Sequence, residues 1–201
     1  MLEFNESTHT YTLNGVIVPS VTSVLSILNG YEGIPLQTLQ RAAERGTAVH
    51  KATELSDLGE LDYGSLDDEI SGFLLGWHKF LDDKKPELVA VEKQVYHPSL
   101  RYAGTLDREL VLDGKLSVLD IKSSYKLMPA TAPQTAAYAE ASNAHRKAKS
   151  DHIKNRYGLR LTADGNYELQ QYKDATDMNV FLSCLNVVRW LEKHNPTKPR
   201  K

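Results

Sequence analysis

The segment YAGTLDRELVLDGKLSVLDIK, residues 102–122, contains two runs rich in Val and Leu on either side of Asp113-Gly114. An Asp-Gly pair between two such runs predicts a β-hairpin, because both residues tolerate the backbone of a tight turn. Side chains two residues apart in a strand share a face of the sheet. Asp120 and Lys122 should therefore point to one face, while their apolar neighbours point into a core.

The first strand of this hairpin carries another acid, Asp107. It can approach Asp120 across the hairpin or through a small register shift, so that two carboxylates and Lys122 meet on one face. Carboxylate oxygens are natural ligands of Mg²⁺, and a lysine beside a bound metal can orient or deprotonate water or stabilise charge on a phosphate. This is the outline of a phosphodiester-hydrolysis site. The alternative is that the acids and the lysine are solvated or paired across an antiparallel sheet.

Composition limits the class of protein. The 201 residues are enough for one hydrophobic core, and we expect a single domain over residues 1–201. The formal net charge is −2 and the pI is about 6.4, so any contact with nucleic acid must come from a local basic patch. The one cysteine, Cys184, excludes an intrachain disulfide and any cluster that needs several cysteines.

Neither end of the chain suggests a membrane protein. The start, MLEFNESTHT, has no basic or apolar region of a signal peptide, and no apolar run approaches membrane-spanning length. We therefore expect a soluble intracellular protein. The basic tail over residues 195–201 contains prolines and is expected to be disordered.

The N-terminal third predicts a hairpin and two helices. Residues 1–19 should form the hairpin, with its turn at Asn14-Gly15. Ser20 or Thr22 should cap the next helix, and the same hydroxyls could hold a phosphate. Residues 35–58 have a helical pattern, and its expected buried stripe is Leu36, Leu39, Ala43, Ala48, Val49 and Ala52.

Several polar residues of this third have two interpretations. His50 is either a structural side chain or a metal ligand that could reach a site on the sheet. Arg45, with the other basic residues of its helix, forms a solvated face or contacts phosphates. The acidic segment 57–68, with two glycines, predicts a mobile connection.

The remaining elements alternate between helix and strand. Residues 69–81 predict a helix, and 88–96 a strand that carries Glu92, for which a cross-strand charge pair is the simple alternative. A helix starting at Pro133 places Gln134 and Tyr138 on one face. Residues 152–172 predict two strands around Asp164-Gly165, and 174–194 a long amphipathic helix.

The order of these motifs resembles the PD-(D/E)xK nuclease superfamily, in its RecB-like exonuclease branch and closest to the mitochondrial genome maintenance exonuclease group and its phage relatives. Each motif is short and weak alone, and the signal comes from their order. The residues that carry it are Pro19-Ser20-Val21-Thr22, Arg45 to His50, Val91-Glu92, Ala103-Gly104-Thr105-Leu106-Asp107, Asp120-Ile121-Lys122 and Gln134 to Tyr138.

The resemblance implies an α/β fold with a restriction-endonuclease-like core, in which a mixed central sheet is flanked by helices. It also implies roles for individual residues. Asp107, Asp120, His50 and the backbone carbonyl of Ile121 would hold Mg²⁺ or Mn²⁺, with Glu92 as an acid near the metal. Lys122 would position the attacking water. Gln134 and Tyr138 would bind DNA or brace Lys122, and the DNA strand would contact Ser20, Thr22 and Arg45.

The activity implied is that of a metal-dependent DNA exonuclease without an iron–sulfur cluster. It would act in the cytoplasm of a bacterium or phage-infected host, in recombination, replication or DNA degradation, with a 5′ start favoured by analogy. A single-strand annealing or single-strand-binding partner is compatible with this role, although no motif specifies one. Two alternatives stay open, a structure-specific or nicking endonuclease on the same fold and a DNA-end-binding module that has lost cleavage.

Overall fold

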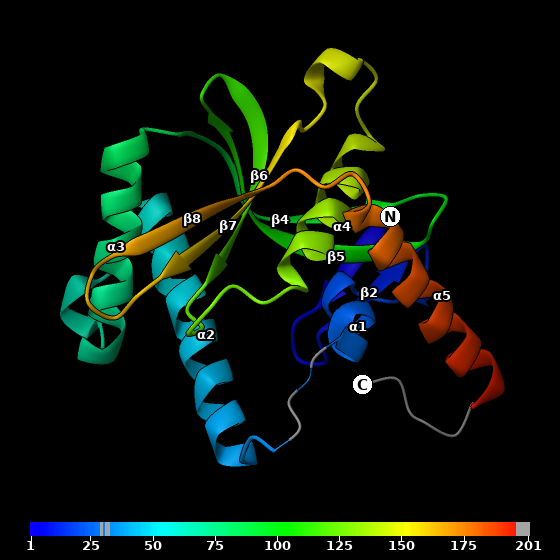
Figure 1. Cartoon of the computed structure of the whole chain (residues 1–201), viewed down its shortest axis with the longest axis horizontal. Coiled ribbons are helices and arrows are strands. Elements are labelled where there is room, and N and C mark those ends of the chain that lie inside the picture. The colour runs from blue at the N-terminus through cyan, green and yellow to red at the C-terminus, as the bar shows by residue number, and fades with distance from the viewer. Residues whose placement is uncertain (29, 31–32, 196–201) are drawn as a thin grey trace.

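The centre of the molecule is a five-stranded sheet (Figure 1). The computed structural model describes residues 1–28, 30 and 33–195. The strands lie in chain order as β4 (Glu87–His97), β5 (Tyr102–Leu112), β6 (Lys115–Lys122), β7 (Asn155–Leu161) and β8 (Tyr167–Tyr172). Strands β6 and β7 pair in parallel and the other neighbours are antiparallel, so the sheet is mixed.

The predicted hairpin at the centre of the sheet is present. Asp113 and Gly114 form its turn with φ values of 50° and 69°. Pairing between β5 and β6 runs from Leu112↔Lys115 to Arg108↔Leu119 and stops there. Beyond this point the backbone N–H of Ile121 donates to the side chain of Asp107, with 2.6 Å between Ile121 N and Asp107 Oδ2. The Asp107 carboxylate therefore takes the place of the next backbone hydrogen bond between the two strands.

Helices cover both faces of the sheet, as Figure 1 shows. One face carries α2 (Leu36–Leu58) and α3 (Asp68–Lys84), while the other carries α1 (Val21–Leu25), α4 (Thr131–Asn143) and α5 (Asp177–His194). The parallel pair requires a crossover connection, and α4 supplies it between β6 and β7. The α/β fold class with a mixed, helix-flanked sheet is confirmed. The described residues also form short 3₁₀ turns, η1 (Ser26–Leu28), η2 (Tyr63–Ser65) and η3 (Lys149–Asp151).

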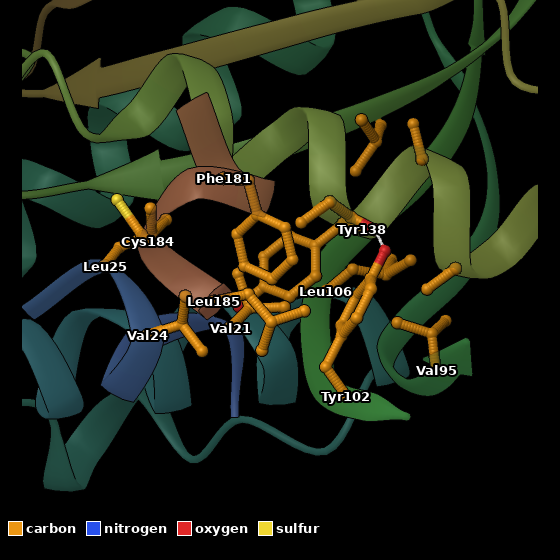
Figure 2. Close-up of a cluster of buried hydrophobic side chains, with 14 of the residues drawn as sticks. Val21, Val24, Leu25, Val95, Tyr102, Leu106, Tyr138, Phe181, Cys184 and Leu185 are labelled. Carbon is orange, nitrogen blue, oxygen red and sulfur yellow. Dashed lines mark hydrogen bonds between the residues drawn. The ribbon is translucent and has the colours of Figure 1, made fainter. Parts of the chain in front are cut away.

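The two layers of helices bury separate hydrophobic clusters. Figure 2 shows the cluster beneath α1, α4 and α5, where Leu106 of the sheet meets Tyr138 and Phe181 of the helices. The second cluster lies beneath α2 and α3 and centres on Trp77 and Phe80, which are fully buried. The sheet is thus apolar on both faces, which fixes β5 and β6 between two packed layers.

The N-terminal region forms a second, three-stranded antiparallel sheet of β1 (Leu2–Asn5), β2 (Thr10–Leu13) and β3 (Val16–Val18). The predicted hairpin at Asn14-Gly15 joins β2 to β3, but β1 is an additional strand, so residues 1–19 form more than a hairpin. This sheet packs on Ala103 of β5, whose N–H donates to the carbonyl of Pro19 at 3.1 Å. It thereby stands at one end of the central hairpin.

Two predictions for the segment 35–68 are wrong. The stripe proposed for α2 is buried only at Val49 and Ala52; Leu36 is 71% exposed, because the first half of the helix extends beyond the sheet (Figure 1). Asp57 does not belong to a mobile connection, because α2 continues to Leu58 and the carboxylate of Asp57 is buried. In the predicted tail, Asn195 caps α5, and residues 196–201 lie outside the described part of the chain.

Candidate active site

A cleft of about 660 Å³ opens where β5 and β6 separate. The middle of α2, from Ala43 to Glu54, forms one wall, the N-terminal sheet and the start of α1 form another, and α4 and β6 close the end. Many of the residues singled out from the sequence line this one cleft: Ser20, Thr22, His50, Glu92, Asp107, Lys122, Gln134 and Tyr138.

Three possible metal ligands meet in the cleft. His50 reaches it from α2, Glu92 from β4 and Asp107 from β5, and one ligand atom of each lies within 4.8 Å of the others. His50 Nδ1 is 3.6 Å from Asp107 Oδ1 and 3.8 Å from Glu92 Oε1. The sequence places these residues far apart, and only the crossing of α2 over the strands brings them together.

Glu92 has an unusual backbone for a residue within a strand. Its φ is 46°, in the left-handed region that a residue with a side chain rarely adopts. It lies opposite Asp107, between the pairs Val91↔Arg108 and Lys93↔Leu106. Strained backbone of this kind is concentrated at functional sites, and here the ladder is interrupted where two acids face each other.

Asp120 and Lys122 form the second part of the site. Lys122 Nζ lies 2.6 Å from Asp120 Oδ2, so the predicted pairing of the two side chains on one face is present. Asp120 is 1% exposed, and apart from this ion pair its carboxylate oxygens have no hydrogen bond among the described residues. It is not a member of the His50–Glu92–Asp107 group, although Asp107 contacts the neighbouring N–H of Ile121.

The site shifts the pKa of several groups. Burial raises the pKa of Asp120 to about 6, partly offset by Lys122 and reinforced by Asp107. Burial lowers the pKa of His50, but Asp107 and Glu92 outweigh this and leave it above 6.5. Burial likewise lowers the pKa of Lys122, and the two aspartates outweigh it. A bound cation would therefore compete with protons at His50 and Asp120.

The donor set fits a divalent metal such as Mg²⁺ or Mn²⁺. Carboxylate oxygens suit both ions, and a neutral imidazole is compatible with Mn²⁺ and other transition metals. Buried Asp120 supports the same conclusion, because its Oδ1 has no partner among the described residues and a buried carboxylate oxygen without one is costly. His50, Glu92 and Asp107 would form the core of such a site. The coordinating roles of Asp120 and the Ile121 carbonyl stay predictions.

Helix α4 brings the predicted Gln134 and Tyr138 to the cleft on one face. Gln134 Nε2 is 3.5 Å from the Tyr138 hydroxyl, and both side chains are buried. Burial raises the pKa of Tyr138 well above 10, and Asp107 and Asp120 add to this, so the hydroxyl stays a donor. The ring of Tyr138 lies against β5 at Gly104, where a Cβ would come within 2.7 Å of Tyr138 Cε1.

The residues predicted to contact DNA are placed differently. Ser20 caps α1 by accepting from the N–H of Ser23 at 3.1 Å, and Thr22 lies 3.3 Å from the Ser20 hydroxyl. Both hydroxyls line the cleft. Arg45 does not line it; its guanidinium lies over the ring of Phe73, 5.8 Å from the centroid. A contact between Arg45 and DNA stays a prediction.

The sequence analysis missed several residues of the site. His9 and Tyr11 line the cleft from the N-terminal sheet, and the Tyr11 hydroxyl is 2.8 Å from Thr105 Oγ1. No local pattern identifies them, because their position depends on how the small sheet packs on β5. Arg108 could have been noticed, since it follows Asp107 at a position that the strand pattern assigns to a core.

Comparison with known proteins gives no family. No family model and no curated protein matches the sequence. Matching solved structures include LHK-Exo in complex with dAMP, with a TM-score of 0.42 and 11% identity over 88% of this chain and 92% of that chain. Another is the alkaline exonuclease LHK-Exo from Laribacter hongkongensis, with a TM-score of 0.42 and 10% identity over 87% of this chain and 91% of that chain. Likeness at this level carries no conclusion about this chain.

The described helices include no membrane span. None of those within residues 1–28, 30 and 33–195 is both long and apolar enough to cross a bilayer.

Proposed function

We propose that this protein is a metal-dependent deoxyribonuclease whose active site is the cleft between α2, α4 and the parted strands β5 and β6. The observation that carries the proposal is that His50, Glu92, Asp107 and Lys122 line one cleft, with buried Asp120 paired to Lys122 beneath it. The sequence supplies the finer proposal, because the order of its motifs resembles exonucleases that act from a free DNA end.

Each side chain has a chemical role in this proposal. When bound, Mg²⁺ or Mn²⁺ supplies Lewis-acid polarisation of the phosphate and of water. Lys122 orients the attacking water and stabilises the negative charge that develops on the phosphoryl oxygens. The hydroxyl of Tyr138 and the amide of Gln134 donate hydrogen bonds to the DNA strand. Ser20 and Thr22, on the facing wall, contact its phosphates.

A single assay distinguishes the proposed exonuclease from the two alternatives, an endonuclease and a DNA-binding module without cleavage. End-labelled linear DNA, single- and double-stranded, is incubated beside covalently closed circular DNA, with Mg²⁺, with Mn²⁺ and with EDTA. The exonuclease shortens only the linear forms and only with metal, and the position of the label gives the polarity. Cleavage of the circle supports the endonuclease alternative. Binding of DNA without any cleavage supports the binding module, and linear DNA that stays intact under every condition contradicts the proposal.

A further inference from the structure

Arg108 follows Asp107 in β5 and is fully buried on the face covered by α2 and α3. Its Nε donates to Asp57 Oδ2 at 2.6 Å, and its Nη2 donates to Thr53 Oγ1 at 3.1 Å. Its Cζ lies 5.3 Å from the centroid of the Trp77 ring, and the indole N–H of Trp77 donates to Asp57 Oδ1 at 2.8 Å. The guanidinium is therefore fixed from several sides by residues that do not line the cleft.

The other edge of the guanidinium faces the proposed metal ligands His50, Glu92 and Asp107. Nη1 of Arg108 donates to Glu92 Oε1 at 3.2 Å and to the backbone carbonyl of Asp107 at 2.7 Å. The side chain of Glu92 is 27% exposed, whereas that of Asp57 is 1% exposed. A single buried cation thus connects an anchor in the core to two of the three residues in the group.

The energetics favour a role in positioning. A buried ion pair is often no more stable than apolar side chains of the same size, so stability alone does not account for Arg108 and Asp57. Glu92 also has a strained backbone and faces Asp107, and two carboxylates this close repel each other. Arg108 offsets that repulsion and holds both groups in place without competing for the cleft.

We infer that Arg108, anchored by Asp57, is a positioning residue that pre-organises Glu92 and Asp107 for a divalent cation. This inference rests on the proposed function, since it concerns the metal affinity of the same site. It predicts that a buried residue outside the cleft controls how tightly the protein binds metal. Groups that orient metal ligands in this way typically change affinity by about 10–100-fold when they are altered.

The test measures the affinity for Mn²⁺ alone by isothermal titration calorimetry. Asp57→Asn keeps the shape and an acceptor for Trp77 but removes the charge, and Arg108→Lys keeps the charge but loses the planar fork. Both should bind Mn²⁺ about 10–100-fold more weakly than wild type. Trp77→Phe, which removes the hydrogen bond to Asp57 and part of the ring beneath the guanidinium but keeps the charges of Arg108 and Asp57, should give a smaller loss and decides the question if Arg108→Lys fails to fold.

The matched control is Arg146→Lys. Arg146 forms an ion pair with Glu109, whose side chain is 1% exposed. Glu109 follows Arg108 in β5 and therefore faces α4 on the other side of the sheet. This variant disturbs an Arg–carboxylate pair whose buried acid lies on the same strand as Arg108. It should lower the melting temperature and leave the affinity for Mn²⁺ unchanged. A loss of stability alone is thereby distinguished from a loss of ligand positioning.

A double-mutant cycle tests whether the anchor acts through the proposed ligand. If it does, Asp57→Asn weakens Mn²⁺ binding less in a Glu92→Gln background than in wild type. Equal factors in both backgrounds, or an Asp57→Asn protein that binds like wild type, overturn the inference and leave the proposed function standing. A wild-type protein that neither binds Mn²⁺ nor cleaves DNA overturns both.

Discussion

At the scale of single residues, the pKa values of His50 and Asp120 would connect the proposed metal binding to pH. Both are raised, to above 6.5 for His50 and to about 6 for Asp120, and a metal binds only the unprotonated groups. The affinity for Mn²⁺ should therefore fall as pH decreases, by about tenfold per pH unit for each proton displaced.

Calorimetric titration at several pH values, in buffers with different ionisation enthalpies, measures both the affinity and the protons released. Asp120→Asn should release fewer protons near pH 6, where the buried carboxyl titrates. Affinity that is constant between about pH 5 and pH 8 contradicts a site built from these groups.

Lys122 should matter for the reaction and not for holding the metal. Lys122→Met removes a donor aimed at the developing charge, and the loss of one such donor typically lowers kcat by about 10²–10³-fold. Removal of a positive charge beside Asp120 should not weaken binding of a cation. The combination of lost cleavage with undiminished Mn²⁺ affinity is the expected result, and a parallel fall in both would assign Lys122 to the metal site instead.

At the scale of elements, α2 places a single face along the cleft. The residues of this face lie three or four positions apart, as expected for one side of a helix. They are Ala43, Gly46, Thr47, His50 and Glu54. Ala43, Gly46 and Thr47 have small side chains, so this part of the helix fills little of the cleft. The first turns of the helix, from Leu36, lie outside this wall and are exposed because they extend beyond the sheet, although their apolar positions suggested a buried stripe.

Two glycines that border the cleft should respond oppositely to alanine. At Gly46 the nearest contact of a Cβ is Ser123 Oγ at 3.9 Å, so Gly46→Ala should stabilise α2 by about 1 kcal/mol. At Gly104 a Cβ would meet Tyr138 Cε1 at 2.7 Å and Val21 Cγ2 at 3.3 Å, so Gly104→Ala should cost about 1–3 kcal/mol. Urea unfolding measures both values, and the same sign for the two variants would contradict the packing described.

Turn chemistry made several elements predictable. Asp113-Gly114 and Asn14-Gly15 specify their hairpins locally, because each turn requires residues that accept positive φ. The burial of α2 was not predictable, since it depends on how far the helix extends past the sheet. For the same reason the pairing of Arg108 with Asp57 and Glu92 is visible only in the folded chain.

At the scale of the whole molecule, the net charge of −2 limits how DNA can bind. An acidic cluster in the cleft repels phosphates, so affinity for DNA should depend on a divalent cation that neutralises it. Fluorescence anisotropy of a labelled oligonucleotide with the Lys122→Met protein should show at least about tenfold weaker binding in EDTA than in Mg²⁺. Equal affinity in the two conditions would favour the binding-module alternative.

Asp107 provides the most direct test of the central claim, because it is one of the proposed metal ligands and also joins β5 to β6. Asp107→Asn keeps an oxygen for the N–H of Ile121 and removes the charge. We would measure Mn²⁺ binding and cleavage of end-labelled linear DNA on the same preparations of wild type and this variant. The account predicts that wild type binds Mn²⁺ and shortens the DNA, and that the folded variant loses both. A variant that still cleaves DNA would show that the chemistry takes place elsewhere.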